Sequence, residues 1–370
     1  MPVNKVKNIL YIGEYIEWYP RTYVFINGLR KQNISVLPIN FRKKKRRKII
    51  KFFIMNFKKL INQNFDLIIY FSFINSIVFL FARILAWIKR IPLVNDYFVS
   101  KHLTTIYDRD LIGRRKRYMR PFNSLYYYIS DFIECHLSDI VILDTLAHLK
   151  YFYETFKIPV KKLKRVFEGV RDDIMLPLNK KKSNNGKITV GFWGSYLLLQ
   201  GVEYIIKTIK TLEHEDDLRF VLIGGGRGCN RSKELAKKLN TKNIEFKNKV
   251  KIEKIPSLIS QFDIGLGIFG DGIKTQIVIP NKVLEGIAMK IPMITSDTPA
   301  IREVFTNNEN IILCQPASTK SLADAIIKLK NNESLRLKIK ENAYNLFKSR
   351  YTVEKMGIEL LKLLNQILNK

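Results

Sequence analysis

The segment IPNKVLEGIAMKIPMITSDTP, residues 279–299, indicates the fold more clearly than any other part of the chain. Its spacing predicts a loop, a helix, a buried strand over 291–295, and a second helix that opens near Pro299. Pro280 suits the first turn of the first helix, because proline lacks the N–H group that would be left unpaired there. A helix that leads into a short buried strand is typical of α/β domains.

Lys282 and Glu285 lie near the N-terminal end of that predicted helix, and Val283, Leu284 and Ile287 form its packed face. Open backbone N–H groups and the helix dipole favour an anion at this end, most often a phosphate. A cation and a carboxylate three residues apart suit a ligand that carries both phosphate and sugar hydroxyls. The alternative is an ordinary amphipathic helix with a surface Lys–Glu pair.

The composition favours two ordinary globular domains. A chain of 370 residues that is 46% hydrophobic and contains 17 tyrosines has enough apolar material for two cores. The three cysteines show no CxxC spacing and the four histidines cluster with none of them. This pattern argues against a disulfide framework or a structural zinc site and favours a reducing compartment. The first residues lack the layout of a signal peptide, so we expect a cytoplasmic protein.

The formal net charge is +31, and it is uneven. Residues 1–180 carry roughly +19 and the remainder roughly +12. The two densest basic runs, 42–48 and 114–120, suit a polyanion such as nucleic acid or an anionic lipid leaflet. Apolar residues follow the first run directly: Ile49, Ile50, Phe52, Phe53, Ile54 and Phe57. The mixture favours peripheral binding to a membrane over binding to nucleic acid; a solvated basic face is the alternative.

Strands and helices alternate twice along the chain, which is the pattern of doubly wound α/β domains. Predicted strands of the first half cover 8–12, 35–39, 66–70, 92–94 and 139–143, and a helix begins at 24. The apolar stretch 71–87 is interpreted as a buried crossover helix; a membrane span is the alternative, although the stretch is interrupted at Arg83.

The second half repeats the alternation. Its predicted strands cover 187–193, 218–223, 243–246, 264–269 and 291–295, and its helices cover 202–212, 322–329, 335–347 and 353–368. A Pro/Asn/Gly/Lys stretch without apolar periodicity separates the halves. We therefore expect an N-terminal domain over 1–178, a linker over 179–186, a C-terminal domain over 187–350, and a final helical segment over 351–370.

Three glycine-bearing loops follow strands of the second half, at Gly194-Ser195, Gly224-Gly225-Gly226 and Gly270-Asp271-Gly272. Ligands of open parallel sheets bind beyond the carboxyl ends of the strands, where glycine lets the backbone approach a phosphate or base. Three such loops beside the Lys282 helix predict a nucleotide site. The 224–226 run does not complete GxGxxG spacing, because residue 229 is Cys, and this disfavours a dinucleotide site of the NAD type.

In the first half, Asp96 follows a predicted strand, with His102 and Asp108 a few residues later. A carboxylate at a strand end is a candidate acid, base or hydroxyl-orienting group. A loop cap or a surface salt bridge is the alternative for each of these residues. His148, near the start of a helix, is a candidate for capping or packing.

The order of these motifs resembles the GT-B glycosyltransferases of retaining family 4, also called glycosyl transferases group 1. The resemblance covers nearly the whole chain, and it is strongest over 189–305. It implies an α/β, GT-B fold of two Rossmann-like doubly wound domains that face an inter-domain cleft. It also implies a nucleoside-diphosphate sugar as donor on the C-terminal domain, an acceptor on the N-terminal domain, and no metal or other cofactor. The last helix, 353–368, would cross back to the N-terminal domain.

Glu285 matches the second of two family glutamates and would bind the ribose hydroxyls. The first falls at Ile277, so the chain looks instead like the subgroup written Ile-Pro-Asn-Lys-x-x-Glu, in which Lys282 and Lys274 would face the diphosphate. Many members carry Arg and Lys where this chain has Ser195 and Gln200. The remaining positions that the resemblance places at the donor are Asn281, Gly194, Gly224 and Gly225, with Val250 and Ile252 at the base.

On the N-terminal domain, Asp96 falls near a histidine or acidic residue of the family and would be the catalytic group, with Arg21, His102 and Asp108 on the acceptor side. The predicted function is transfer of a hexose-type sugar to a glycan or lipid-linked acceptor at the cytoplasmic face of a membrane. Two alternatives remain: a GT-B sugar-nucleotide epimerase or hydrolase, and a non-catalytic protein that binds polyanions.

Overall fold

The chain folds into two compact units, which we call unit 1 and unit 2. Unit 1 comprises residues 1–169 and 352–370, and unit 2 comprises residues 170–351. The computed structural model describes residues 6–72, 76–98, 100–108, 120–178, 186–226 and 228–369. The predicted linker at 179–186 lies outside the described residues except for Gly186.

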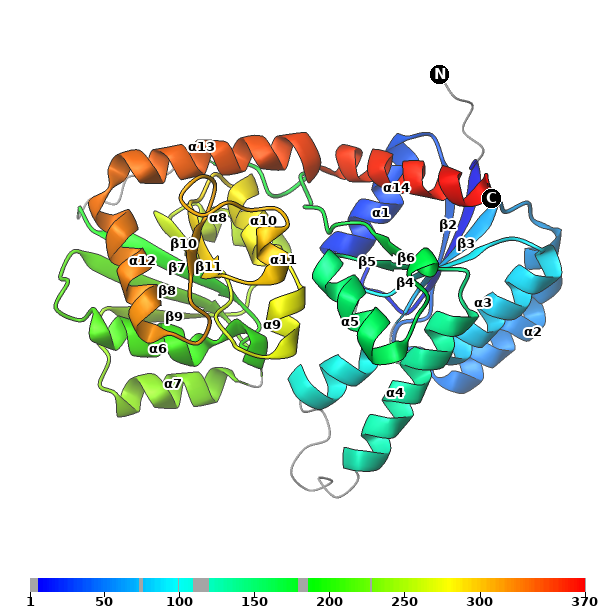
Figure 1. The fold of residues 1–370 in the computed structure, drawn as a ribbon, viewed down its shortest axis with the longest axis horizontal. Coiled ribbons are helices and arrows are strands. Elements are labelled where there is room, and N and C mark those ends of the chain that lie inside the picture. Colours follow the sequence, from blue (N-terminus) through cyan, green and yellow to red (C-terminus); the bar gives the residue numbers. More distant parts are fainter. Residues whose placement is uncertain are drawn as a thin grey trace. The chain divides into compact units, whose positions relative to one another are not determined.

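Unit 1 is built on a six-stranded parallel sheet (Figure 1). The strands are β1 (Asn8–Gly13), β2 (Ser35–Asn40), β3 (Leu67–Phe71), β4 (Leu93–Asp96), β5 (Ile140–Leu143) and β6 (Leu163–Arg165). The helices are α1 (Pro20–Lys31), α2 (Arg46–Asn62), α3 (Ser76–Lys89), α4 (Arg120–Leu137), α5 (Leu146–Phe156) and α14 (Val353–Leu368), with a π-helical turn at Leu103–Asp108.

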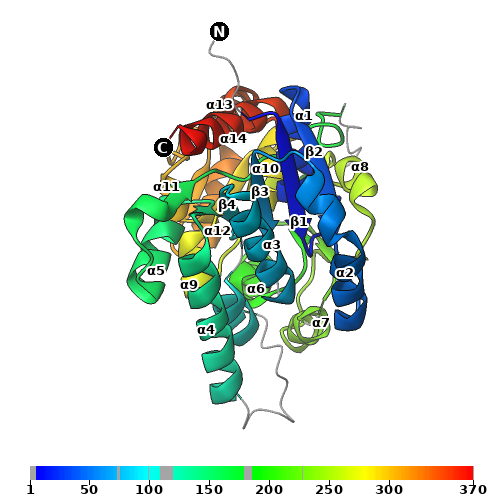
Figure 2. The ribbon, with the colours of Figure 1, turned by 90° about the vertical axis from the view of Figure 1, so that its right-hand side faces the viewer.

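The strand order in unit 1 is β2-β1-β3-β4-β5-β6. From β2 to β6 the chain moves in one direction across the sheet, so right-handed crossovers place α2, α3, α4 and α5 on one face. Helices α2 and α3 share one hydrophobic cluster with β1 and β3, and α4 and α5 share another with β5. Figure 2 shows α2, α3 and α4 together in front of the sheet.

Unit 2 has a second six-stranded parallel sheet, in the order β12-β11-β10-β7-β8-β9. Its strands are β7 (Ile188–Gly194), β8 (Leu218–Gly224), β9 (Ile244–Asn248), β10 (Ile264–Leu266), β11 (Met293–Ser296) and β12 (Ile312–Cys314). Its helices are α6 (Val202–Thr211), α7 (Cys229–Lys238), α8 (Ile255–Ile259), α9 (Ile273–Ile277), α10 (Asn281–Ala288), α11 (Pro299–Arg302), α12 (Thr319–Asn331) and α13 (Glu333–Arg350).

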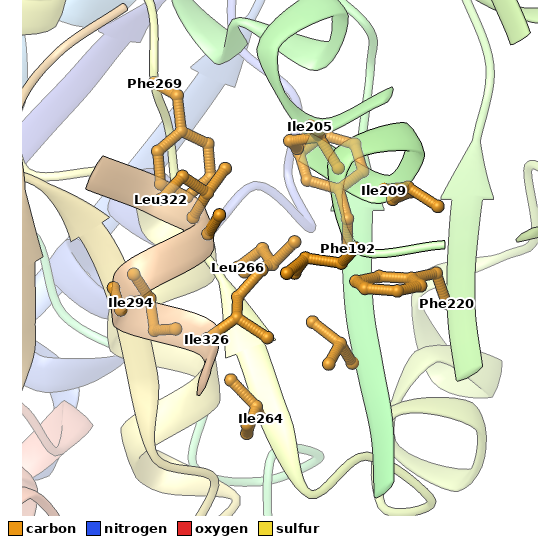
Figure 3. Close-up of a cluster of buried hydrophobic side chains, with 14 of the residues drawn as sticks. Phe192, Ile205, Ile209, Phe220, Ile264, Leu266, Phe269, Ile294, Leu322 and Ile326 are labelled. Carbon is orange, nitrogen blue, oxygen red and sulfur yellow. The ribbon is translucent and has the colours of Figure 1, made fainter. Parts of the chain in front are cut away.

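One apolar cluster fills the space between this sheet and helices α6 and α12 (Figure 3). Phe192 and Leu266 enter it from the neighbouring strands β7 and β10, and Ile205 and Ile326 enter it from the helices. The strands β7 and β8 are buried along most of their length, as expected for parallel strands covered on both faces, and one of their faces supplies the sheet side of this core.

The predicted fold of two Rossmann-like, doubly wound α/β units is confirmed. The strand predicted over 264–269 is shorter, because β10 ends at Leu266. The edge strands β6 and β12 were not predicted; each is only three residues long. No helix in the described part of the chain is long and apolar enough to span a bilayer.

Two glycines hold α14 against α1 within unit 1. A Cβ atom added to Gly357 would lie 2.2 Å from the carbonyl oxygen of Gly28, and one added to Gly28 would lie 2.7 Å from the carbonyl oxygen of Val353. The two helices therefore touch backbone to backbone, and neither glycine can gain a side chain without separating them.

We predict that Gly357→Ala lowers the free energy of unfolding by about 1–3 kcal/mol, because steric repulsion outweighs the helix preference of alanine. Chemical denaturation followed by circular dichroism measures this effect. Gly225→Ala is the control, since its Cβ would meet only Lys249 Cβ at an ordinary 3.5 Å. Equal stability of Gly357→Ala and the wild type would contradict the close approach of the helices.

Candidate functional site: the carboxyl edge of the unit 2 sheet

The loops after β7, β8 and β10 lie at the same edge of the unit 2 sheet, because all six strands are parallel. β7 and β10 are neighbours, with Ile264 paired with Val190 and Leu266 with Phe192. From β7 the chain builds the sheet outward on one side through β8 and β9, and later on the other side through β10. Such a switch point is where open α/β sheets bind ligands.

The loop after β7 packs against the loop after β8, backbone against backbone. Gly224 and Gly226 have φ angles of 148° and 125°, which side chains rarely adopt. A Cβ atom on Gly224 would lie 1.9 Å from the carbonyl oxygen of Gly194, and one on Gly226 would lie 2.3 Å from that of Ser195. The glycines predicted to approach a ligand therefore also approach each other.

Lys282, in the first turn of α10, extends into this region and is almost fully buried. Its Nζ lies 3.7 Å from the centre of the Phe192 ring. A Cβ atom on Gly194 would lie 2.7 Å from that Nζ and 2.6 Å from Gln200 Oε1. A side chain at residue 194 would therefore displace the lysine amine and the Gln200 amide from these positions.

The Lys282 amine has no hydrogen-bond partner among the described residues. Burial lowers the pKa of Lys282 well below its ordinary value of 10.5, and Glu285 only partly offsets this. A buried amine without a counter-ion is costly for the fold, and perturbed titratable groups of this kind are concentrated at functional sites.

Glu285 lies one turn further along α10 and is partly buried. Its Oε2 accepts a hydrogen bond from Trp193 Nε1 at 2.7 Å. Burial raises the pKa of Glu285, while the Trp193 hydrogen bond and the charge of Lys282 act in the opposite direction. The carboxylate is thus oriented by a tryptophan rather than paired with the lysine, and the two groups form a separate cation and hydrogen-bond acceptor.

The positions where the chain departs from the family pattern have local roles. Gln200 Oε1 accepts from the backbone N–H of Tyr196 at 3.1 Å, and its Nε2 lies 3.5 Å from Ser195 Oγ. Gln200 thus holds the loop after β7 closed, whereas Ser195 is exposed. Ile277, in place of the first glutamate, is buried at the end of α9.

The other predicted donor residues also lie at this edge. Asn281 opens α10, and Lys274 lies on α9; both are half-buried. Val250 and Ile252 follow β9, the outermost strand on the other side of the sheet, and are half-buried too. Their predicted roles stay predictions.

Phe192 and Trp193 were not predicted to belong to the site. Their position immediately before the glycine at the end of β7 was the available signal. Sequence alone does not show that one ring faces Lys282 and that the other donates to Glu285, because these pairs are about ninety residues apart.

In unit 1, Asp96 and Arg21 come together, but in a closed ion pair. Both side chains are fully buried, and Arg21 Nε donates to Asp96 Oδ1 at 2.7 Å. Tyr11 OH lies 3.4 Å from Asp96 Oδ2. Burial raises the pKa of Asp96, against the effect of Arg21 and Tyr11. These contacts are those of a structural ion pair, and the catalytic role of Asp96 stays a prediction.

The remaining acceptor-side candidates are more dispersed. His102 Nε2 lies 2.8 Å from Ser124 Oγ, and partial burial lowers its pKa. The side chain of Asp108 lies outside the described residues. His148 is buried, and its Nδ1 lies 2.6 Å from Asp144 Oδ1, while its backbone N–H is capped by Thr145. His148 therefore helps to begin α5, in agreement with the capping and packing interpretation.

Comparisons with known proteins agree with this architecture. Residues 177–346 match the family model of glycosyl transferases group 1. An uncharacterized glycosyltransferase of Methanocaldococcus jannaschii is 25% identical over 240 residues, which are 63% of this chain and 59% of that protein. The chain spans between 43% and 59% of the length of the curated relatives that it matches.

Two solved structures resemble nearly the whole chain. Sucrose-phosphate synthase from Thermosynechococcus elongatus has a TM-score of 0.73 at 13% identity, and the match covers 98% of this chain and 99% of that one. HepE from Anabaena, in complex with UDP-glucose, has a TM-score of 0.69 at 14% identity, over 97% and 99% of the two chains. At these identities the likeness establishes the fold, which is of the GT-B type.

We predict that Lys282→Met raises the free energy of unfolding by about 1–3 kcal/mol, because it removes an uncompensated buried amine at nearly constant volume. The unfolded chain binds a proton that the folded lysine gives up. Wild-type stability should therefore rise with pH between the lowered pKa of Lys282 and its ordinary value, and the variant should lose this dependence.

Thermal and urea unfolding across this pH range measure both effects. Lys320→Met, at an exposed position, is the matched control and should change stability little. A Lys282→Met variant less stable than the wild type would show that the amine stabilises the fold through Phe192.

Proposed function

We propose that this chain is a glycosyltransferase that moves a sugar from a nucleoside-diphosphate sugar to a glycan or lipid-linked acceptor. The buried, unpartnered amine of Lys282, beside the partly buried carboxylate of Glu285 at a sheet switch point of the described structure, carries the proposal. The match of residues 177–346 to the group 1 glycosyltransferases supports it, as does the UDP-glucose held by HepE.

In the proposed complex, Lys282 and Lys274 contact the diphosphate and Glu285 accepts hydrogen bonds from the ribose hydroxyls. Val250 and Ile252 line the base. A diphosphate would give the Lys282 amine an anionic hydrogen-bond partner, which it lacks among the described residues. The free energy that burial of the amine costs the folded protein would then be recovered as binding free energy. Glu285 arrives already oriented by Trp193, which lowers the entropy lost on binding.

We further propose that transfer retains the anomeric configuration and needs no metal. The departing diphosphate is then stabilised by lysine side chains and the N-terminus of α10, while the acceptor hydroxyl is positioned on the same face of the sugar. The product belongs to a cell-surface polysaccharide or glycolipid, and the enzyme acts at the cytoplasmic face of the membrane.

We predict that Lys282→Met weakens binding of the cognate UDP-, GDP- or ADP-sugar by about 1.5–3 kcal/mol, the value of a charge-assisted hydrogen bond. Glu285→Gln keeps an acceptor for Trp193 but removes the charge, and should weaken binding by about 1 kcal/mol. A thermal-shift screen of the three donor classes identifies the ligand, and calorimetry gives the affinities.

Lys320→Met serves as the control, with unchanged affinity expected. Wild-type affinity in both site variants would show that the donor binds elsewhere. Hydrolysis of the donor without any acceptor, at a rate equal to turnover, would favour the hydrolase alternative.

The protonation state of Lys282 should change when the donor binds. Donor binding should take up a proton above the lowered pKa of Lys282, because the diphosphate restores the charged amine. Affinity should therefore fall as pH rises from that lowered pKa toward the ordinary value. Calorimetry in two buffers of different ionisation enthalpy measures the uptake; Lys274→Met should retain it and Lys282→Met should abolish it. Equal uptake by both variants would rule out Lys282 as the titrating group.

A further inference from the structure

The outer face of α4 in unit 1 is apolar although it is exposed. Phe122 is 74% exposed, the highest value among the large apolar residues described on this helix, and the exposed residues recur at helical spacing of three and four. The exposed apolar residues of α4 are Phe122, Leu125, Tyr126, Ile129, Phe132, Ile133 and Leu137. Helix α4 thus presents apolar side chains to the solvent over more than three turns.

The neighbouring helix α3 extends this surface. Ser76 Oγ lies 2.8 Å from Ser130 Oγ, and Arg83 Nη1 donates to the carbonyl oxygen of Leu137 at 3.0 Å. Both contacts join residues 54 positions apart, so α3 and α4 run parallel in register. The exposed apolar residues of α3 are Leu80, Ile84, Trp87 and Ile88. The two stripes therefore form one continuous surface, which we call the α3–α4 face.

The opposite side of α4 is held firmly in place. Asp131, fully buried, accepts from Tyr97 OH at 2.5 Å and from Ser100 Oγ at 2.7 Å. Glu134, also buried, forms an ion pair with Lys101 and accepts from Ser72. Rotating the helix to hide its apolar stripe would break these buried bonds, so the stripe is a fixed feature of the fold.

The exposed charged side chains of α2, α3 and α4 among the described residues are basic. Asp131 and Glu134 are the only acidic residues of α2, α3 and α4, and both point inward. Helix α2 packs beside α3, with Phe53 stacked on Phe81 at 4.0 Å between ring centres. Its exposed charges are all basic: Arg46, Arg47, Lys48, Lys51, Lys58 and Lys59. An apolar face is thus bordered by cations.

We propose that the α3–α4 face inserts into the interfacial region of an anionic lipid leaflet, while the basic side chains of α2 contact lipid phosphates. Aromatic and aliphatic residues beside lysine and arginine are the composition of helices that lie in a membrane interface. Nucleic acid has no extended apolar surface in which a continuous stripe of apolar side chains could be buried. A second copy of a chain with net charge +31 would be repelled. The inference deepens the proposed membrane location and rests on it, but not on the donor site.

A cavity at the edge of the α3–α4 face fits the same partner. It has a volume of about 550 Å³, and Trp87 forms part of its wall. Ile91, Ile140 and Leu363 give it an apolar lining, and Arg90 and Lys164 supply cations. Asp139, the one acidic residue among its described lining, is bonded to Arg83. A lipid phosphate with the start of its acyl chain matches this combination.

The basic run 42–48 is exposed as expected, but the apolar residues after it do not form the insertion surface. Ile49 and Phe53 are buried in the core against α3, and Ile54 is the only one of the six that is exposed. The predicted basic run at 114–120 lies outside the described residues apart from the backbone of Arg120.

The test is co-sedimentation of the full chain with phosphatidylcholine vesicles that contain or lack phosphatidylglycerol. We expect binding only to the anionic vesicles. Ile129→Gln/Ile133→Gln, on the exposed side of α4, should weaken it about tenfold or more. Lys51→Glu/Lys58→Glu, on α2, should weaken it about tenfold or more and reduce its dependence on salt. The same two-site change at exposed Leu337 and Ile358, to Gln, is the matched control and should leave binding unchanged.

Circular dichroism and the donor-induced thermal shift confirm that each variant is folded, and both should be unchanged. Full vesicle binding by the folded α4 variant would overturn the proposal. The proposal would also be overturned if the wild type and the other variants self-associate while the α4 variant alone is monomeric, because the face would then be an interface between copies of the chain. Loss of donor binding in the wild type with vesicle binding intact would refute the proposed activity and leave the docking face standing.

Discussion

The amine of Lys282 is buried in unit 2 without a hydrogen bond from the described residues, and the nearby charge of Glu285 only partly offsets that burial. Much of the site follows from this constraint. The absence of a side chain at Gly194 leaves room for the amine, because a Cβ atom would lie 2.7 Å from Nζ. The Phe192 ring faces the amine at 3.7 Å, and this contact adds to the attraction of Glu285. A neutral side chain at residue 200 avoids adding a second cation next to an amine that burial already opposes.

The same degree of burial has the opposite outcome in unit 1. Arg21 is as deeply buried as Lys282, but Asp96, Asp144 and Glu168 all act on its charge, and they raise its pKa despite the burial. The charge of Arg21 is balanced within the protein by its ion pair with Asp96, although its Nη2 has no hydrogen-bond partner among the described residues. Only Glu285 among the described residues acts on the charge of Lys282, without offsetting the effect of burial, and the amine can still bind an anionic ligand. This contrast favours Lys282 over Asp96 and Arg21 as the centre of the chemistry.

The local sequence pattern was enough to predict the fold and part of the candidate site. Buried strands such as 218–223 and the helix after Pro280 follow from periodicity, and glycines at strand ends mark the carboxyl edge. Partners distant in sequence were not accessible. Trp193 and Glu285 are 92 positions apart, and Arg21 and Asp96 are 75 apart. The strands β6 and β12 have three residues each, too few for an alternation to be recognised.

Helix α4 shows a different limit of periodicity. An apolar stripe at helical spacing ordinarily predicts the face that packs on a core, and the polar stripe is assigned to solvent. Here the assignment is reversed: Asp131 and Glu134 face the protein, and Phe122 and Ile129 face outward. Periodicity defines two faces but not which of them is buried; the buried partners Tyr97 and Lys101 decide that. An apolar face that the described residues of unit 1 leave uncovered, with cations along its border, is matched by an anionic membrane surface.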